Sequence, residues 1–261
     1  MKYVRTFLLG IQVEFLLRIN IFGWFLQGLI PSLLLIFVWF VILGDRPSIN
    51  GFTKGDFAVY YLFITVGWYI VGGTFGITTG NKIKDGMINT TLLKPYNVVL
   101  GQGIEEQAWK VLSLCLSLPV VVLILFLLRN TIHIRLSLEQ TGLLIVSLLL
   151  GAINFALLEG ISGITAFWVT EMSPVYHLKS VLLSLFGGCL VPLALMSHPI
   201  RLLADILPFK YMFYVPVSIL LSKTSRPGAD IAIQAFYIIL LFGVYKIIWQ
   251  RGIKKYEAVG I

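Results

Sequence analysis

The sequence predicts an all-α membrane protein with six transmembrane helices. Of its 261 residues, 58% are hydrophobic and 12% are charged, and the mean hydropathy is +0.91. Soluble domains carry roughly 25% charged residues. Six apolar stretches approach the ~20 residues that a hydrocarbon core requires, which leaves little chain for an aqueous domain. We therefore treat residues 1–261 as a single transmembrane domain.

The net charge of +8 is better explained by membrane topology than by a nucleic-acid partner. The 20 Lys and Arg residues lie at helix ends and in loops, whereas a nucleic-acid site gathers them on one solvated face with aromatic residues. Six spans place both termini on one side, and the positive-inside rule favours the cytoplasm. The sequence thus predicts a multi-pass protein of the cytoplasmic membrane. Two isolated cysteines, Cys115 and Cys189, make no metal site.

The chain begins with a predicted interface helix and two spans. Apolar residues in 1–18 recur at offsets of three and four, which is typical of an amphipathic helix on the membrane surface; the alternative is that this segment extends the first span. Residues 19–43 carry no charge and form span one, with a tolerated kink at Pro31. Residues 57–80 form span two, whose glycines allow helices to pack closely.

A polar loop at residues 81–97 follows span two and still contains apolar side chains. Met87, Ile88, Leu92 and Leu93 stand among its lysines. They either dock on the helices of their own chain or present a small apolar surface to another protein. We favour the second interpretation.

The remaining spans follow a short polar stem. Residues 102–110 form this stem, with an i,i+4 pair of Glu106 and Lys110. The four later spans are predicted at residues 111–128, 141–169, 180–196 and 229–249.

Residues 198–228 are predicted to form a re-entrant helical hairpin on the outer side. Their apolar stretches are too short to span, and Arg201 and Lys210 would be costly at the bilayer centre. Two short helices broken near Pro208 therefore fit. The competing interpretation makes residues 212–221 part of a seventh span, which would place the basic C-terminal tail outside.

Glu159 and Asn154 are polar residues inside the predicted fourth span. A carboxylate at that depth costs about 2.5–3.5 kcal/mol on insertion scales, so it should face protein or water. It either lines a substrate route or makes a structural hydrogen bond to another helix or to a partner subunit. Both interpretations remain open from the sequence.

Residues 160–163 match the GxSG signature of rhomboid-type intramembrane proteases. A serine nucleophile needs a base within hydrogen-bond reach, and in that family a histidine on a later span supplies it. Here His133, His177 and His198 lie at helix ends or in loops. Small residues for helix packing are the better explanation, and we assign no catalytic residue.

Three features make the chain similar to ABC-2-type permeases, in the branch described as ABC-2 family transporter protein. These are the N-terminal surface helix, the segment from Ile83 to Pro95 after span two, and the segment LPFKYMFYVPVSIL from Leu207 to Leu220. The loop segment resembles the family pattern I-x-x-G-x-[IL] followed by LLKP. The resemblance covers nearly the whole chain.

The resemblance implies a permease subunit of an ABC exporter. Such a unit is a transmembrane dimer, of two copies or two related permeases, and is driven by two cytosolic ATPase subunits. ATP and Mg²⁺ would bind those subunits, since this chain has no GxxxxGK[ST] loop, and no cofactor or enzymatic activity is expected on it. The resemblance assigns ATPase coupling to Ile83, Asp85, Gly86, Leu92, Leu93, Lys94 and Pro95, and more weakly to Glu171, Pro174 and Tyr176.

The alternative function is a membrane channel or secondary carrier that works without an ATPase. A proton-coupled carrier is expected to show more than one titratable group within the membrane, together with repeat symmetry. The sequence indicates Glu159 alone, which favours the permease.

Overall fold

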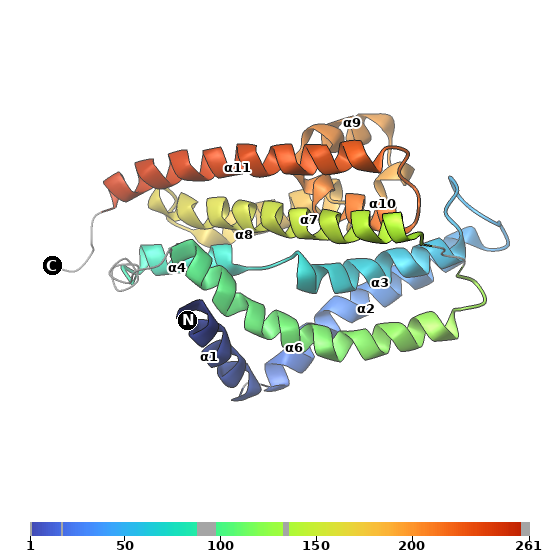
Figure 1. Cartoon of the computed structure of the whole chain (residues 1–261), viewed down its shortest axis with the longest axis horizontal. Helices are drawn as coiled ribbons and strands as arrows, with labels where there is room; N and C mark the ends of the chain where they lie inside the picture. Colours follow the sequence, from blue (N-terminus) through green and yellow to red (C-terminus); the bar gives the residue numbers. More distant parts are fainter. Residues whose placement is uncertain (1, 17, 88–97, 133–135, 257–261) are drawn as a thin grey trace.

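The computed structural model describes residues 2–16, 18–87, 98–132 and 136–256, which form helices joined by short turns (Figure 1). These described residues contain no β-strand, so the all-α prediction is confirmed. Five of their helices are long and apolar enough to cross a membrane, where six were expected. They are Phe22–Leu43, Lys54–Lys84, Gly101–Leu127, Leu138–Phe167 and Pro227–Lys255.

The N-terminal segment forms a helix of its own, α1 (Lys2–Leu16), before the long helix α2 (Arg18–Leu43). α1 packs on α6 (Val98–Leu127). There a Cβ atom on Gly10 would lie 2.9 Å from Cβ of Ala108, so the two helices approach closely. The location of α1 on a membrane surface stays a prediction.

The second predicted span, residues 57–80, is two helices and not one. α3 (Lys54–Ile70) begins at a capping box and ends before a break, after which α4 (Phe75–Lys84) follows. Glycines 72 and 73 lie in the break and have a weak helix propensity. The N–H of Thr74 donates to Glu106 Oε1 at 2.5 Å. The predicted span lies within the candidate span Lys54–Lys84, which the break interrupts. A carboxylate from α6 satisfies the backbone group that the break frees.

Three other long helices agree with predicted spans. α6 joins the predicted stem and third span into one helix. α7 (Leu138–Ile164) begins at a capping box and packs against α4, α10 and α11. The last helix, α11 (Pro227–Lys255), covers the sixth predicted span and the basic tail. α7 is therefore central to the arrangement.

Residues 180–196, predicted as the fifth span, do not form a single helix. α8 (Met172–Phe186) begins in the predicted connector and ends at Gly187. Gly188 follows with φ +74°, a left-handed conformation that favours glycine. Its carbonyl accepts a hydrogen bond from Tyr60 Oη at 2.6 Å. The predicted boundaries were wrong because this turn, held against α3, ends the helix early.

Residues 198–228 contain short helices separated at Leu207. These are α9 (His198–Ile206), the 3₁₀ turn η3 (Pro208–Tyr211) and α10 (Tyr214–Leu220). α11 holds the segment in place, because Gln234 Nε2 donates to the carbonyl of Tyr211 at 2.6 Å. The break falls where the sequence predicted it. The re-entrant position in a membrane stays a prediction.

The beginning of α1 and the end of α11 lie at the same end of the molecule as α4 (Figure 1). The turn between α2 and α3, and the beginnings of α7 and α11, lie at the opposite end. α8 contacts α4 on one side and α9 on the other. It thus carries the chain from the end of α7 towards the region where α11 begins.

Candidate functional site

The two segments that the sequence assigns to ATPase coupling lie next to each other. Lys84 Nζ at the end of α4 is 3.8 Å from Glu171 Oε1, which precedes α8. A Cβ atom on Gly80 would lie 2.5 Å from Met172 Cε, so the last turns of α4 pack directly on the start of α8. We call the surface formed by residues 80–87 and 170–176 the α4–α8 end.

The predicted coupling residues on α4 differ in exposure. Ile83 is buried with Phe75 and Ile164, so it packs within its own chain. Asp85 is exposed, and Gly86 has φ +73°. The predicted Leu92, Leu93, Lys94 and Pro95 lie outside the described residues.

The predicted coupling residues near α8 are more accessible. Glu171 and Pro174 are exposed, and Tyr176 is half-buried. The Lys179 ammonium lies 5.1 Å from the centre of the Tyr176 ring, within the range of a cation–π contact. Met87 is 55% exposed at the other edge of the surface, as expected for a side chain that could meet a partner.

Two buried carboxylates hold the N-terminus of α4. Glu106 Oε1, from α6, accepts hydrogen bonds from N and Oγ1 of Thr74, at 2.5 and 2.9 Å. Glu159 Oε2, from α7, accepts from the N–H of Gly76 at 2.8 Å. The first N–H groups of a helix lack internal partners and carry a partial positive charge. α4 is therefore tied to both α6 and α7 at its start.

Glu159 also forms an ion pair with Lys179 of α8. Glu159 is fully buried and Lys179 is 7% exposed, and a buried charge is costly unless it has a partner. Lys179 therefore lies within the bundle. This geometry supports the structural interpretation of Glu159 within one chain, although its role in transport stays a prediction.

Asn154 joins α7 to α11. Its Nδ2 donates to the carbonyl of Gln234 at 2.9 Å, and it is fully buried. Gln234 in turn donates from Nε2 to the carbonyl of Ser147 at 3.1 Å. Asn154 and Glu159 thus stand on the same helix but bind different neighbours.

Sequence reasoning missed the burial of Glu106 and Lys110. The predicted i,i+4 pair is absent from the described structure, since Glu106 binds Thr74 and Lys110 makes no ion pair with it. The two side chains are 8% and 4% exposed. The local sequence gives no signal for this burial, because residues at helical spacing from the two, such as Gln102, Gln107 and Ser113, are polar.

The GxSG segment serves helix packing in the described structure. Ser162 Oγ donates to the backbone carbonyl of Glu159 at 2.8 Å. A Cβ atom on Gly163 would lie 2.8 Å from the carbonyl oxygen of Gly76, so α4 and α7 touch through their backbones. His177 and His198 are exposed, and His133 lies outside the described residues. No described histidine binds Ser162.

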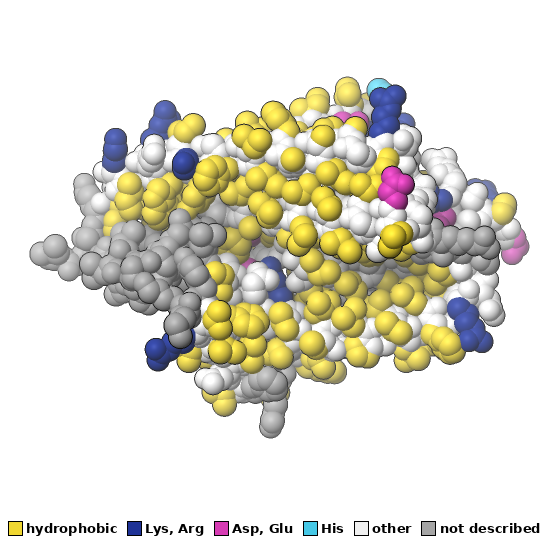
Figure 2. All heavy atoms as spheres, in the orientation of Figure 1, with side chains coloured by type: hydrophobic (Ala, Val, Ile, Leu, Met, Phe, Trp, Pro, Cys, Tyr) yellow, Lys and Arg dark blue, Asp and Glu magenta, His cyan; other side chains and the backbone are white. Residues whose placement is uncertain are grey.

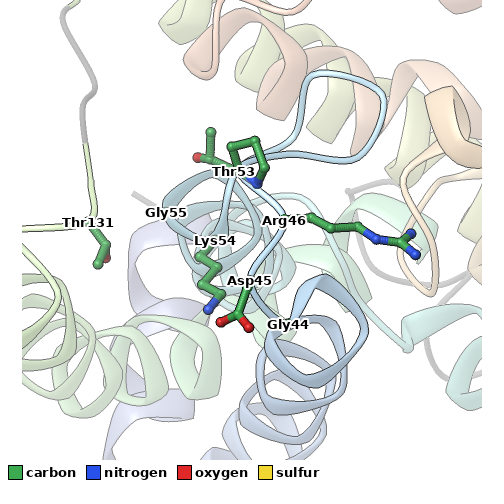
Figure 3. Close-up of a pocket in the computed structure, with 8 residues that line it drawn as sticks. Gly44, Asp45, Arg46, Thr53, Lys54, Gly55 and Thr131 are labelled. Carbon is green, nitrogen blue, oxygen red and sulfur yellow. The ribbon is translucent and has the colours of Figure 1, made fainter.

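A cavity of about 430 Å³ lies at the opposite end of the molecule, between the turn after α2 and Thr131. Asp45 and Lys54 point toward the same space, and Arg46 points away (Figure 3). A Cβ atom on Gly55 would lie 2.0 Å from the Thr131 carbonyl oxygen, so the two turns are in backbone contact. The charged side chains that line this cavity reach solvent, so they need no ligand to offset burial.

A larger cavity, of about 520 Å³, borders the break between α3 and α4 and is lined by α6, α7 and α11. Lys110 is among its lining residues. A Cβ atom on Gly73 would lie 3.2 Å from Lys110 Nζ, and a Cβ atom on Gly76 would lie 2.5 Å from Glu159 Oε2. Lys110 and Glu159 therefore both lie close to the start of α4.

In a comparison with protein families, residues 29–260 match the family described as ABC-2 family transporter protein. No curated protein and no solved structure matched the chain. The match covers most of the 261 residues. It includes the segments at Ile83–Pro95 and Leu207–Leu220, whereas the N-terminal helix lies outside it. The chain therefore belongs to the ABC-2 transporter family and is a membrane permease.

Proposed function

We propose that the chain is the permease subunit of an ABC exporter. It pairs with a second permease, a copy or a related chain, and with two cytosolic ATPase subunits that bind ATP and Mg²⁺. The assembly moves an unidentified substrate out across the cytoplasmic membrane by alternating access. The observation that carries this proposal is the adjacency of the two coupling segments, joined by Lys84 and Glu171. One ATPase subunit can contact both at once.

The connections of α4 provide a route from the ATPase to the bundle. Closure of the ATPase pair moves the α4–α8 end. Glu106 then transmits the displacement of α4 to α6, and Glu159 transmits it to α7 and α8. The break at residues 71–74 lets α4 change its angle to α3, because few helical hydrogen bonds cross it. The spans behind α4 switch the substrate cavity between the two sides.

Six passes and cytoplasmic termini fit the arrangement of the helices. The five long helices account for five passes, and α8 with the turn after it accounts for the sixth. With this assignment we propose that residues 198–228 lie at the outer side, as a hairpin that enters the bilayer partway. Burial of Lys110 and Lys179 removes two charges from the cytoplasmic surface, so the positive-inside argument is weaker than the sequence indicates.

A secondary carrier is the second candidate, and one observation favours it. Glu106, Lys110 and Lys179 are buried in or beside spans in addition to Glu159, so the bundle holds several titratable groups. Titratable groups at such depth mark proton routes in pumps and carriers. Membership of the ABC-2 family outweighs this observation, because the family consists of ABC transporter components.

Subunit composition tests the proposal. The tagged full chain is purified from its native membrane in a mild detergent, and the copurified chains are identified and weighed by mass spectrometry. We expect an ATP-binding chain in equal number to the permeases. Transport by vesicles that lack any ATP-binding chain would overturn the proposal in favour of the carrier.

A further inference from the structure

We propose that the cavity between α6, α7 and α11 binds an anionic lipid of the surrounding membrane, with its head group on Lys110. The inference goes beyond the proposed function, because lipid binding to the permease requires no ATPase. It rests on the shape and lining of the cavity, on the environment of Lys110, and on what the neighbouring carboxylates already bind.

The cavity has the size and the lining of a site for an acyl chain. Its volume of about 520 Å³ is within the range of ligand pockets, roughly 300–1,000 Å³. Apolar side chains provide most of the wall, among them Val71, Phe75, Leu149, Ile153 and Phe242.

The mouth of the cavity faces the surface that spans present to lipid. Leu149, Ile153 and Phe242 are between 46% and 59% exposed, although all lie in candidate spans. Figure 2 shows a hollow on this face between α6 and the pair of α7 and α11, with basic atoms visible at its floor. An acyl chain can therefore enter sideways from the bilayer.

Lys110 provides a positive charge inside this apolar site. It is nine residues into the span that begins at Gly101, roughly 14 Å along the helix axis. It is 4% exposed and lines the cavity. Among the described residues its ammonium group has no hydrogen-bond or ion-pair partner. Three N–H donors are thus left without an acceptor at a depth where this is costly.

Glu106 does not supply the missing acceptor. Its Oε1 binds Thr74, and its Oε2 is buried without a hydrogen-bond partner in the described structure. Glu106 attracts Lys110 through space without contacting it. Lys110 lines the cavity, so an anionic oxygen that reaches its ammonium group there gains charge-assisted hydrogen bonds. Gln107 also lines the cavity, and its amide oxygen can accept from a head-group hydroxyl.

A lipid fits these observations better than a second copy of the chain. A copy would have to provide an anion at the same depth. In such a copy the deep carboxylates Glu106 and Glu159 already bind groups of their own chain. The copy would therefore present apolar helix faces and no anion to Lys110. A small soluble anion would match Lys110 but leave the apolar wall empty. An anionic lipid satisfies both parts of the site.

Native mass spectrometry of the purified full chain tests the proposal. The protein is titrated in a neutral detergent with phosphatidylglycerol, with phosphatidylcholine, and with glycerol phosphate as a head group without tails. We expect the first lipid to bind about tenfold more tightly than the second, which corresponds to ~1.4 kcal/mol. Glycerol phosphate is expected to show no binding at these concentrations. Binding of glycerol phosphate as tightly as the lipid would show a free-anion site and overturn the proposal.

Variants separate the head-group contact from the cavity wall. Lys110→Gln should abolish the preference for phosphatidylglycerol, and Lys110→Arg should retain it. Lys254→Gln, which removes an exposed charge at the end of α11, is the matched control and should change nothing. A full preference in Lys110→Gln would overturn the proposal. Ile153→Trp fills the cavity without changing charge and should reduce binding of both lipids, so the proposal stays testable if Lys110→Gln folds poorly.

The outcome is independent of the ATPase experiment. An ATP-binding chain that copurifies with a permease lacking lipid preference would leave the proposed function intact and reject the lipid site. Cross-linking of two copies through single cysteines at Leu149 and Phe242 would show that a second permease covers the cavity, and would also reject it.

Discussion

The ammonium group of Lys179 on α8 contacts the carboxylate of Glu159 on α7, and both side chains are buried. The second carboxylate oxygen accepts a hydrogen bond from Gly76 at the start of α4. One side chain therefore joins three helices. Two of these helices, α4 and α8, form the surface that we assign to ATPase coupling.

Removing one partner of this ion pair should cost more than removing both. Lys179→Met leaves the Glu159 charge buried without compensation, and we expect it to lower the free energy of unfolding by ~3–5 kcal/mol. Combining it with Glu159→Gln should recover most of that loss. Thermal unfolding of the purified chain in detergent measures all three variants. Equal losses in the single and double variants would contradict the pairing.

The exposed pair of Lys84 and Glu171 is the matched control. Its charged atoms are 3.8 Å apart, and the Glu171 side chain is 75% exposed. Such pairs contribute about 0–1 kcal/mol, so Lys84→Met should barely change stability.

Two substitutions at Glu159 test the role of its carboxylate. Glu159→Gln should fold and alter transport only if the residue lines a substrate route, whereas Glu159→Leu should impair assembly if its contacts are structural.

Gly163 and Gly142 on α7 provide a second comparison. A Cβ on Gly163 would lie 2.8 Å from the backbone oxygen of Gly76, whereas a Cβ on Gly142 would meet nothing within 4 Å. Gly163→Ala should therefore separate α4 from α7 and lower the melting temperature. Gly142→Ala should be neutral, or stabilise by up to about 1 kcal/mol through helix propensity. Equal melting temperatures would show that the close approach is unimportant.

A charge swap tests whether Glu171 contacts an ATPase. Glu171→Lys should reduce the amount of ATP-binding chain that copurifies. The double variant Lys84→Glu and Glu171→Lys restores the ion pair within the chain, yet it leaves the partner facing a reversed charge. We expect it to stay defective. Full recovery in the double variant would mean that the pair serves only the permease.

Gly86 and two leucines test the coupling loop. Gly86 has φ +73°, which a β-branched side chain adopts only with strain, so Gly86→Val should distort the loop that follows α4. Leu92→Asp and Leu93→Asp should remove an apolar contact with the partner. We expect each variant to insert normally and to uncouple ATP hydrolysis from transport. Retained transport with the ATPase still bound would show that coupling lies elsewhere.

The sequence predicted the helices whose signal is local. Long, mostly apolar stretches identify α2, α7 and α11, and prolines with charged residues identify the short helices near Leu207. These features depend on the composition of each segment alone. The family resemblance assigned two segments to ATPase coupling, and that role stays a prediction. The structure places Lys84 Nζ of one segment 3.8 Å from Glu171 Oε1 of the other.

The features that the sequence did not predict depend on contacts between distant segments. Thr74 ends a helical break because Glu106, on another helix, binds its N–H. Lys179 is buried because Glu159 pairs with it, and the two lie 20 residues apart. Taken alone in the sequence, each of these residues indicates only a helical position or a charged residue in a loop. Only their positions in three dimensions show that the charges compensate one another.

The last prediction concerns residues 198–228, for which the structure gives two fixed points at one end of the molecule. Lys223 Nζ is 3.0 Å from Asp56 Oδ2 at the start of α3. Ser222 Oγ accepts a hydrogen bond from Gln140 Nε2 at the start of α7, at 3.0 Å. The segment after α10 therefore lies beside the first turns of two spans, far along the molecule from the C-terminal end of α11 (Figure 1).

Single cysteines, in a background without Cys115 and Cys189, test the side on which this segment lies. An impermeant thiol reagent applied to intact cells should label cysteines placed at Ser197, Ser225 and Glu139, since all three belong to the outer end. A cysteine at Lys255 should react only after permeabilisation, because it closes α11 at the opposite end. A seventh span through residues 212–221 would put Ser197 and Ser225 on opposite sides of the membrane. Labelling of only one of these two from outside would therefore reject the hairpin, and labelling of Lys255 in intact cells would reject the cytoplasmic C-terminus.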